Sequence, residues 1–377
     1  MMSIKRNKPF SLLIKPISGK CNLACTYCFY SAMSDFLSET TDNPNMTEYT
    51  ASILTASYLD TYQKEYIFAW QGGEPTLMGL DFYRYIIQLQ MRYGKCGDTI
   101  ANAIQTNGAL LTKEWAKFLS QYNFLVGISL DGPPKIHNQY RKYKNGYGTC
   151  ADVMRAISLL KTYNISFNSL TLISAANVRK AKTVFDFLCN EGIHYQQYIP
   201  CVEISQNGYP MPFSIEPEDW GVFLCEIFDE WIKFGVGKVS IRLFDSLINY
   251  YVSGYHQQCT NTKLCNQYFV VEYNGDVFPC DFFVTKELKV GNVFSDSWQE
   301  MTNSTVYREF SIRKSALSRD CALCSYIDFC GGDCPKYRCI NTSMNSNLSR
   351  LCNGWKIFYE HALPQISKIS EAFSPCH

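Results

Sequence analysis

The feature that most constrains this chain is a set of three cysteines in the order C-x-x-x-C-x-x-C near the N-terminus. Cys21, Cys25 and Cys28 follow a short strand-like segment that ends at Lys15. Closely spaced thiols in a long chain without a visible export signal suit a metal centre better than a disulfide framework. Because a [4Fe–4S] cluster normally takes four cysteine ligands, three ligands would leave one iron open for chemistry.

The composition excludes several classes of protein. Of the 377 residues, 46% are hydrophobic and 15% are aromatic, which predicts a folded chain with a large core. The 35 basic and 34 acidic residues nearly balance and form no basic block, so we expect no nucleic-acid partner. No apolar run is long enough to span a membrane, and no signal peptide is recognisable. We therefore expect a cytoplasmic monomer without membrane contact.

From Phe10 to Ile204, short apolar runs alternate with amphipathic stretches, which is the pattern of parallel βα units. The expected strands are Ser11–Ile14, Tyr66–Trp70, Ile100–Gln105, Leu125–Leu130, Ser166–Ile173 and Gln197–Val202. The expected helices between them are Thr47–Gln63, Leu80–Tyr93, Thr112–Tyr122, Cys150–Tyr163 and Val178–Glu191. This α/β alternation predicts a partial, TIM-like (β/α)6 barrel with its active site at the C-terminal ends of the strands.

A second region follows the barrel. Two further helices are expected at Glu216–Phe234 and Ile241–Tyr251, and a helical tail near Asn353–Ile369. Cysteines crowd the segment between Cys259 and Cys352. The predicted organisation is a barrel at 1–235, a helical linker at 236–258, and a cysteine-rich domain with a C-terminal helix at 259–377.

Polar motifs follow the expected strands at the edge where a barrel has its active site. They are Gln71-Gly72-Gly73-Glu74-Pro75, Gln105-Thr106-Asn107-Gly108 and Ser129-Leu130-Asp131-Gly132-Pro133. Two adjacent glycines allow a backbone to approach a ligand closely. A Gly-Gly-Glu-Pro turn alone is weak evidence. One βα unit after the cysteine triplet, however, it resembles the motif with which radical S-adenosylmethionine (SAM) enzymes bind the SAM amino group.

This resemblance implies ligands for two cofactors. Cys21, Cys25 and Cys28 would hold a [4Fe–4S] cluster whose open iron binds SAM. His137 and Arg141 follow the fourth strand, and a guanidinium suits bidentate binding of the SAM carboxylate, although a loop arginine is more often a surface charge. In full, the residues implied to contact SAM are Tyr27, Gly73, Ser129, Arg141 and Val202.

The cysteine-rich region carries a longer pattern, C-x9-G-x4-C, then C-x2-C-x5-C-x3-C, then a final Cys352, with Cys259 preceding it. It resembles the SPASM extension of radical SAM enzymes that modify peptides. The resemblance implies two more [4Fe–4S] clusters, three in all. The cluster nearer the barrel would take Cys259, Cys265, Cys280 and Cys334, and the outer cluster Cys321, Cys324, Cys330 and Cys352. Structural zinc is the alternative for C-x2-C pairs, but the barrel triplet favours iron and sulfur.

The remaining seven cysteines have no ligand pattern, and we interpret them as buried or incidental thiols. They are Cys96, Cys150, Cys189, Cys201, Cys225, Cys339 and Cys376.

Asp281 stands directly after Cys280, among aromatic residues. Such a carboxylate is either a base or a turn residue that accepts a backbone N–H. The run Pro279-Cys280-Asp281-Phe282, with the two motifs that begin at Gln71 and Gln105, resembles the anaerobic sulfatase-maturating enzymes from about Ser11 to about Glu360. That resemblance implies Asp281 as the catalytic base.

The family resemblance also implies a reaction. An electron from a donor such as a flavodoxin or ferredoxin cleaves SAM to a 5′-deoxyadenosyl radical, which removes hydrogen from Cβ of a Cys or Ser in an unfolded sulfatase peptide. Asp281 takes the thiol or hydroxyl proton, and the nearer auxiliary cluster accepts the remaining electron. The product is Cα-formylglycine (3-oxoalanine).

Two alternatives stay open. One is a SPASM maturase that forms a thioether or carbon–carbon crosslink in a ribosomal peptide. Such enzymes often carry an N-terminal peptide-binding domain of about 80 residues, and the position of Cys21 leaves no room for it. The other is a zinc-stabilised binding module without catalysis, which would leave the cysteine triplet and the Gly73 turn unexplained.

Overall fold

Parallel strands alternate with helices from Ser11 to Ser253. The computed structural model describes residues 9–30, 44–205, 207–339 and 347–373. The strands are β1 (Ser11–Lys15), β2 (Glu65–Trp70), β3 (Thr99–Thr106), β4 (Leu125–Ser129), β5 (Phe167–Ile173), β6 (Tyr195–Pro200) and β7 (Ser240–Ile241). The helices are α2 (Glu48–Leu59), α3 (Gly79–Tyr93), α4 (Lys113–Gln121), α5 (Pro134–Tyr140), α6 (Cys150–Thr162), α7 (Ala181–Asn190), α8 (Pro217–Phe234) and α9 (Arg242–Ser253).

Short elements and one long C-terminal helix follow in the cysteine-rich region. The strands are β8 (Tyr268–Glu272), β9 (Asp276–Phe278) and β10 (Gly291–Asn292). The helices are α10 (Trp298–Asn303), α11 (Thr305–Arg313), α12 (Arg319–Ala322), α13 (Ile327–Cys330), α14 (Pro335–Cys339) and α15 (Cys352–Glu371).

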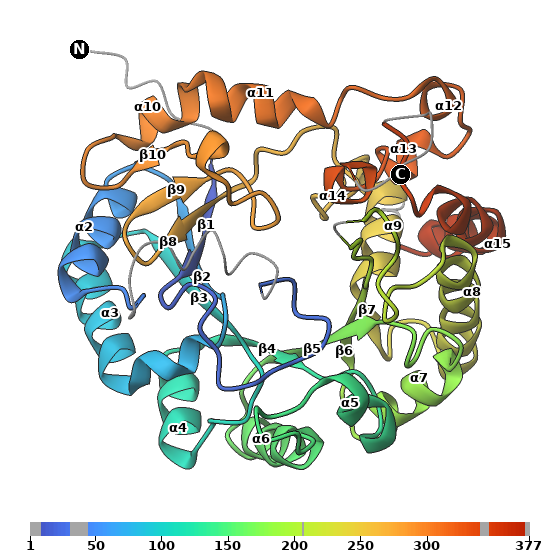
Figure 1. The fold of residues 1–377 in the computed structure, drawn as a ribbon, viewed down its shortest axis with the longest axis horizontal. Coiled ribbons are helices and arrows are strands. Elements are labelled where there is room, and N and C mark those ends of the chain that lie inside the picture. The colour runs from blue at the N-terminus through green and yellow to red at the C-terminus, as the bar shows by residue number, and fades with distance from the viewer. Residues whose placement is uncertain (1–8, 31–43, 206, 340–346, 374–377) are drawn as a thin grey trace.

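The described strands form one sheet in the order β10-β9-β8-β1-β2-β3-β4-β5-β6-β7. All neighbours from β8 to β7 are parallel. In Figure 1 these strands follow an arc around the centre of the molecule, and α2, α3, α4, α6, α7 and α8 lie outside it. Within the described residues β10 and β7 remain the two edges, so the barrel is open. The predicted partial (β/α)6 barrel is confirmed, with β1–β6 matching the six expected strands.

Strand β8 joins the cysteine-rich region to the barrel, which the sequence analysis did not predict. It pairs with β1 along its whole length, from Ser11 opposite Tyr268 to Lys15 opposite Glu272. The antiparallel strand β9 then returns beside β8 and ends at Phe278, two residues before Cys280. The sheet therefore continues past the expected boundaries at 235 and 258, which stay predictions as domain limits.

Two elements at the barrel mouth differ from expectation. The segment after Pro133, expected as a loop, forms α5 with proline at its first position, where the missing N–H costs no hydrogen bond. The sixth strand ends at Pro200 rather than Val202. Beyond Pro200 the chain folds back on itself, with Met211 N donating to Glu203 O at 2.9 Å, so this backbone leaves the sheet.

Local signals fix several helices as expected. The predicted helix start at Thr112 is confirmed, because its hydroxyl accepts from Trp115 N and caps α4. The expected C-terminal helix is α15, which lies beside α8 in Figure 1. A Cβ added to Gly354 of α15 would lie 2.0 Å from Pro217 O, so glycine lets the two helices touch.

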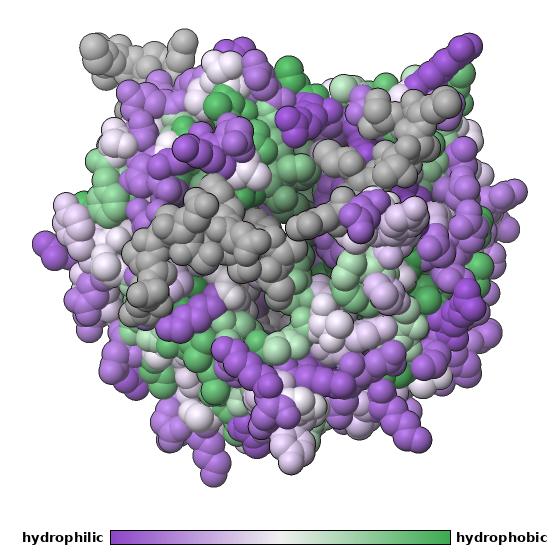
Figure 2. All heavy atoms as spheres, in the orientation of Figure 1, coloured by the Kyte–Doolittle hydropathy of each residue, from purple (hydrophilic) through white to green (hydrophobic). Residues whose placement is uncertain are grey.

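The core lies between the sheet and the outer helices. Buried side chains such as Leu12, Phe68, Trp70 and Val126 alternate along the strands and pack against those helices. Figure 2 shows hydrophilic residues over the outer parts of one face, with hydrophobic residues exposed nearer its centre. None of the helices in the described part of the chain has both the length and the apolar character that a membrane crossing requires.

Candidate active site

The three predicted cluster cysteines lie in the loop that leaves β1. Cys21, Cys25 and Cys28 are half-buried free thiols. The Cys21 Sγ accepts hydrogen bonds from Leu23 N at 3.4 Å and from Asn107 Nδ2 at 3.7 Å. Burial raises the pKa of the Cys21 thiol to about 12. A metal that binds here must therefore displace the proton.

The glycine turn after β2 packs directly on this cysteine loop. Gly73 N donates to Ser18 O at 2.7 Å, and Glu74 N donates to Lys20 O at 2.9 Å. A Cβ on Gly73 would lie 2.0 Å from Lys20 O, so any side chain would push the cysteine loop away. The predicted SAM contact Gly73 is thus also required by packing.

The buried Glu74 carboxylate ties the ends of β2 and β3 together. It accepts from Thr106 Oγ1 at 2.8 Å, from Asn107 N at 2.7 Å and from Thr76 Oγ1 at 2.6 Å. Burial raises the pKa of Glu74, and these donors oppose that rise. The Glu74 oxygens are thus already hydrogen-bonded within the protein, and the part of the turn that faces the cavity is the backbone of Gly72 and Gly73.

Arg141 follows α5, and Asp131 holds its guanidinium. Its Nε and Nη2 donate to the two Asp131 oxygens at 2.9 and 3.2 Å. Tyr27 OH and Leu172 N donate to the same carboxylate. Burial alone would lower the pKa of Arg141, but Asp131 raises it, so the side chain stays a cation. Among the described residues, the Nη1 side has no hydrogen-bond partner and can receive a ligand carboxylate.

A cavity of about 190 Å³ opens where these elements meet. Its lining includes the three cysteines and four of the five residues implied to contact SAM: Tyr27, Gly73, Ser129 and Arg141. The fifth, Val202, is fully buried and packs in a hydrophobic cluster with Trp220 and Phe223. Its contact with adenosine stays a prediction.

Asp281 reaches the cavity wall from the cysteine-rich region. It is 5% exposed. Its Oδ1 accepts from Tyr30 OH at 3.0 Å, its Oδ2 accepts from Gln71 Nε2 at 2.8 Å, and Lys15 Nζ lies 2.5 Å from Oδ1. Tyr30 and Gln71 both line the cavity. The carboxylate predicted as base is therefore held by donors from three elements of the barrel mouth, one residue from Cys280.

Lys15 ends β1 and lies between two buried carboxylates. Its Nζ is 3.6 Å from Glu272 Oε1, and the Tyr30 ring centre is 4.7 Å away. Burial alone would lower the pKa of Lys15, but Asp281 and Glu272 outweigh it and raise the pKa. Burial raises the pKa of Glu272 against the effect of Lys15. The sequence analysis missed Lys15, Tyr30 and Glu272; a lysine that ends an otherwise apolar strand was the available signal.

Four cysteines that are distant in sequence line one cavity in the cysteine-rich region: Cys259, Cys265, Cys280 and Cys334. This inner quartet is the set predicted for the cluster nearer the barrel. Burial raises the pKa of Cys280 to about 12, and the Tyr268 hydroxyl lies 3.4 Å from its Sγ.

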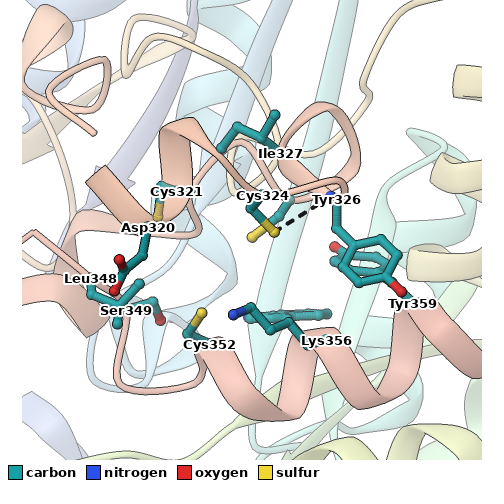
Figure 3. Close-up of a pocket in the computed structure, with 13 residues that line it drawn as sticks. Asp320, Cys321, Cys324, Tyr326, Ile327, Leu348, Ser349, Cys352, Lys356 and Tyr359 are labelled. Atoms are coloured by element: carbon teal, nitrogen blue, oxygen red, sulfur yellow. Dashed lines mark hydrogen bonds between the residues drawn. The ribbon is translucent and has the colours of Figure 1, made fainter. Parts of the chain in front are cut away.

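The other four predicted ligands, Cys321, Cys324, Cys330 and Cys352, line a second cavity. In Figure 3, Cys352 in the first turn of α15 faces Cys321 and Cys324 across this cavity. Tyr326 N donates to Cys324 Sγ at 3.4 Å (Figure 3). The structure thus brings the four cysteines of this outer quartet to one cavity, and their role as cluster ligands stays a prediction.

A short segment joins the two cavities. Cys330 lines the outer cavity and Cys334 the inner one. Between them, Gly331, Gly332 and Asp333 have φ angles of 59°, 73° and 62°, a tight left-handed path. The two quartets are therefore separated by a single turn of backbone.

The cysteines without a ligand pattern are scattered. Cys150, Cys189 and Cys201 are buried, Cys225 is half-buried and Cys96 is exposed. Cys376 and the side chain of Cys339 lie outside the described residues.

Two family models match the chain. Radical SAM superfamily matches residues 16–188, and SPASM, an iron-sulfur cluster-binding domain, matches residues 259–325. Domains of both kinds bind [4Fe–4S] clusters, and three clusters agree with the family. The second match covers the region that contributes β8, Cys280 and Asp281.

Matches to curated relatives extend over nearly the whole length of the chain. The chain is 36% identical to the serine-type anaerobic sulfatase-maturating enzyme of Bacteroides thetaiotaomicron, over 95% of this chain and 90% of that protein. It is 34% identical to the cysteine-type enzyme of Clostridium perfringens, over 96% of this chain and 98% of that protein.

Solved structures of similar fold agree with these sequence matches. Native anSMEcpe with bound AdoMet and Cp18Cys peptide matches with a TM-score of 0.90 and 33% identity, over 97% of this chain and 100% of that one. Streptococcus suis SuiB bound to precursor peptide SuiA shares the fold at a TM-score of 0.64, with 16% identity over 91% of this chain and 76% of that one. At the identity and coverage of the sulfatase-maturating relatives, the chain belongs to the anaerobic sulfatase-maturating enzyme family of radical SAM enzymes.

Proposed function

We propose that this chain oxidises a Cys or Ser side chain of an unfolded sulfatase polypeptide to Cα-formylglycine. Its relatives are named for sulfatase maturation, and a similar structure contains AdoMet and a peptide. The observation that carries the proposal is the position of Asp281, between the barrel cavity and the inner cysteine quartet.

The thiols fit three [4Fe–4S] clusters. The barrel triplet and each quartet supply sulfur ligands alone, the donor set that such clusters take. Cys21, Cys25 and Cys28 would hold the cluster that binds SAM, and the two quartets the auxiliary clusters. Zinc also suits a set of four thiols, but it gives no role to the three-cysteine set beside a polar cavity.

The cavity lining fits SAM. The Nη1 side of Arg141 can bind its carboxylate, with Asp131 fixing the guanidinium. The backbone at Gly73, after β2, and the Ser129 side chain, at the end of β4, offer polar contacts to the cavity. Tyr27 supplies an aromatic wall and is itself fixed by its bond to Asp131.

When bound, the cofactors supply hydrogen abstraction at the substrate Cβ and an acceptor for one electron. Asp281 accepts the proton of the substrate thiol or hydroxyl. A carboxylate has about four acceptor sites; Tyr30 and Gln71 donate to Asp281 and Lys15 is ion-paired with it, so acceptor capacity remains for the substrate. The substrate thus loses a hydrogen atom, a proton and an electron. Serine yields the aldehyde directly, and cysteine yields a thioaldehyde that water hydrolyses.

The test is anaerobic incubation of the cluster-loaded enzyme with SAM, a reductant and two sulfatase peptides that differ only in Cys or Ser at the target. An aldehyde, identified by mass spectrometry and by its hydrazine adduct, is the expected product. SAM cleavage without aldehyde in either peptide would refute the proposal, and a crosslinked ribosomal peptide would establish the alternative activity. A flavodoxin or ferredoxin donor, a monomeric state and a cytoplasmic location also stay predictions.

A further inference from the structure

Two buried cations lie beside the inner cysteine quartet without a carboxylate partner. Lys314 follows α11 and is 1% exposed, and Arg338 of α14 is 4% exposed. Within the described part of the chain, no carboxylate oxygen lies at ion-pair distance from either side chain, although every other buried lysine or arginine of the active site has one. Burying a cation without a counter-charge is unfavourable. No ion-paired carboxylate supplies that counter-charge, and the buried Asp333 acts on Lys314 only from beyond ion-pair distance.

The ammonium of Lys314 is aimed at the backbone that carries the inner quartet. Its Nζ donates to Cys259 O at 2.5 Å and to Thr260 O at 2.7 Å. Cys259 and Thr260 both line the inner cavity. A second bond joins the same segments, because Cys265 N donates to the carbonyl of Ser311, three residues before Lys314 in the chain. Burial lowers the pKa of Lys314, and the negative charges of three inner cysteines (Cys265, Cys259 and Cys334) and of the buried Asp333 oppose that fall.

The guanidinium of Arg338 donates its hydrogen bonds to backbone carbonyls. It donates to Gly332 O at 2.6 Å, to Gly331 O at 3.1 Å and to Asp333 O at 3.3 Å. It also donates to Lys314 O at 2.8 Å. Arg338 therefore fixes the turn between the two quartets and the backbone of Lys314, while the Lys314 ammonium donates to two carbonyls of the inner cavity wall.

The outer quartet has different surroundings. The lysine that lines its cavity, Lys356, is exposed on α15, where solvent screens its charge. The buried Asp333 carboxylate lies between the two cavities. Its Oδ2 accepts from Ser349 and Trp355 of the outer cavity wall, and its Oδ1 accepts from Cys334 N of the inner quartet. Among the described residues, a buried ammonium bonded to the cavity wall, with no carboxylate at ion-pair distance, is thus a property of the inner site.

We infer that Lys314 is the counter-cation of the inner cluster and raises its reduction potential, which favours transfer of the substrate electron to this site. The inference rests on the proposed assignment of the inner quartet to a [4Fe–4S] cluster. Net charge and surrounding dipoles set the potential of such clusters. A fixed buried cation stabilises the reduced state, which carries one more negative charge, more than the oxidised state.

The experiment uses the full-length protein with Cys21, Cys25 and Cys28 changed to Ala, so that only the auxiliary clusters respond. Redox titrations followed by electron paramagnetic resonance compare Lys314→Met with Lys314→Arg, and Cys324→Ala identifies the outer signal. Lys314→Met should shift the inner midpoint to lower potential and leave the outer one unchanged. Lys314→Arg should stay near the parent value. Lys356→Met is the matched control and should leave the inner midpoint unchanged.

An unchanged inner midpoint in Lys314→Met, or an equal shift in Lys314→Arg, would overturn the inference. If Lys314→Met binds less iron than the parent protein, its midpoint cannot be compared. The iron contents of Lys314→Arg and Lys314→Gln then test the inference instead. Retention in Lys314→Arg with loss in Lys314→Gln supports the counter-charge, whereas loss in both means that the lysine only packs. Because no peptide is present, an unchanged midpoint refutes this inference alone, and absence of aldehyde in the separate peptide assay refutes only the proposed reaction.

Discussion

Lys15 Nζ lies 2.5 Å from Asp281 Oδ1, and this buried ion pair joins the first barrel strand to the residue after Cys280. Lys15→Met would leave Asp281 and Glu272 buried without a cation. Breaking a buried pair in this way costs about 3–5 kcal/mol, so the free energy of unfolding should fall clearly. Anaerobic urea unfolding of the cluster-loaded protein measures it.

The matched control is Lys95→Met, which breaks the exposed pair with Asp60. Exposed pairs contribute about 0–1 kcal/mol. The double variant Lys15→Met, Glu272→Gln should recover part of the loss, because one of the two stranded charges is removed. Equal unfolding midpoints for Lys15→Met and Lys95→Met would contradict the assigned role.

Asp281→Asn should separate SAM cleavage from peptide oxidation. Asparagine keeps the shape of the side chain but cannot take a proton, and a positioned base contributes roughly 10²–10⁴-fold. Formylglycine formation should fall by about that factor, while 5′-deoxyadenosine is still released. Both products are quantified in one chromatographic run.

The exposed Asp296 of the same region supplies the control, since Asp296→Asn should oxidise peptide at the parent rate. An Asp281→Asn enzyme that forms formylglycine normally would remove Asp281 from the proton-transfer step.

The cysteines proposed as ligands, the Gly73 turn and Asp281 could be singled out from the sequence because each lies in a short motif with characteristic spacing. The grouping of Cys259 with Cys334 came from resemblance, and the cavities group them in the same way. The strands of the barrel were accessible because apolar runs repeat with regular helices between them.

The pairing of β1 with β8 was not accessible. It joins Lys15 to Glu272 across more than half of the chain, and no local pattern records such a contact. The partners of Asp281 depend on that pairing, which explains why Lys15 and Tyr30 were missed. Val202 was misplaced relative to its strand because an apolar run does not show where a backbone leaves a sheet.

Gly73→Ala should disturb the barrel cluster rather than the auxiliary ones. The new Cβ would meet Lys20 O at 2.0 Å, and the backbone that carries Cys21 must move to relieve that overlap. SAM cleavage should be lost, and the iron content should fall by up to about four atoms, the content of one cluster. Gly97→Asn, in a loop with open space around the glycine, is the control and should keep both SAM cleavage and the full iron content. A fully active Gly73→Ala enzyme would show that the turn tolerates a side chain.

The two quartets predict separate losses of iron. Three [4Fe–4S] clusters contain about twelve iron atoms. Cys324→Ala, at the outer cavity, should remove about four of them and leave SAM cleavage intact, because the barrel cavity is separate. Cys265→Ala should also remove about four, and with them formylglycine formation. The buried Cys201 belongs to neither quartet, so Cys201→Ala should keep all the iron. Zinc in place of iron in anaerobically purified protein would contradict the cluster assignment.

His137 predicts how stability depends on pH. The side chain is fully buried, its Nδ1 accepts from Asp131 N at 3.3 Å, and its Nε2 lies 2.9 Å from Thr149 Oγ1. Burial lowers the pKa of His137 to about 4, whereas an unfolded histidine has a pKa of about 6.5. At pH values between these two pKa values, His137 is protonated in the unfolded chain but neutral in the folded chain. The contribution of His137 to the free energy of unfolding is therefore complete above about pH 6.5. It is lost as the pH falls toward 4, by at most about 1.4 kcal/mol per pH unit.

His137→Gln removes this titration and retains a polar group. The wild-type protein should be the more stable of the two near neutral pH, and its advantage should shrink as the pH falls from about 7.5 to about 5.5. Urea unfolding at several pH values, with visible absorbance showing that the clusters persist, gives the two free energies. A constant difference across this range would mean that folding leaves the pKa of His137 unchanged. The folded ring would then take up a proton below about pH 6.5, and Asp131 N would lose its acceptor there.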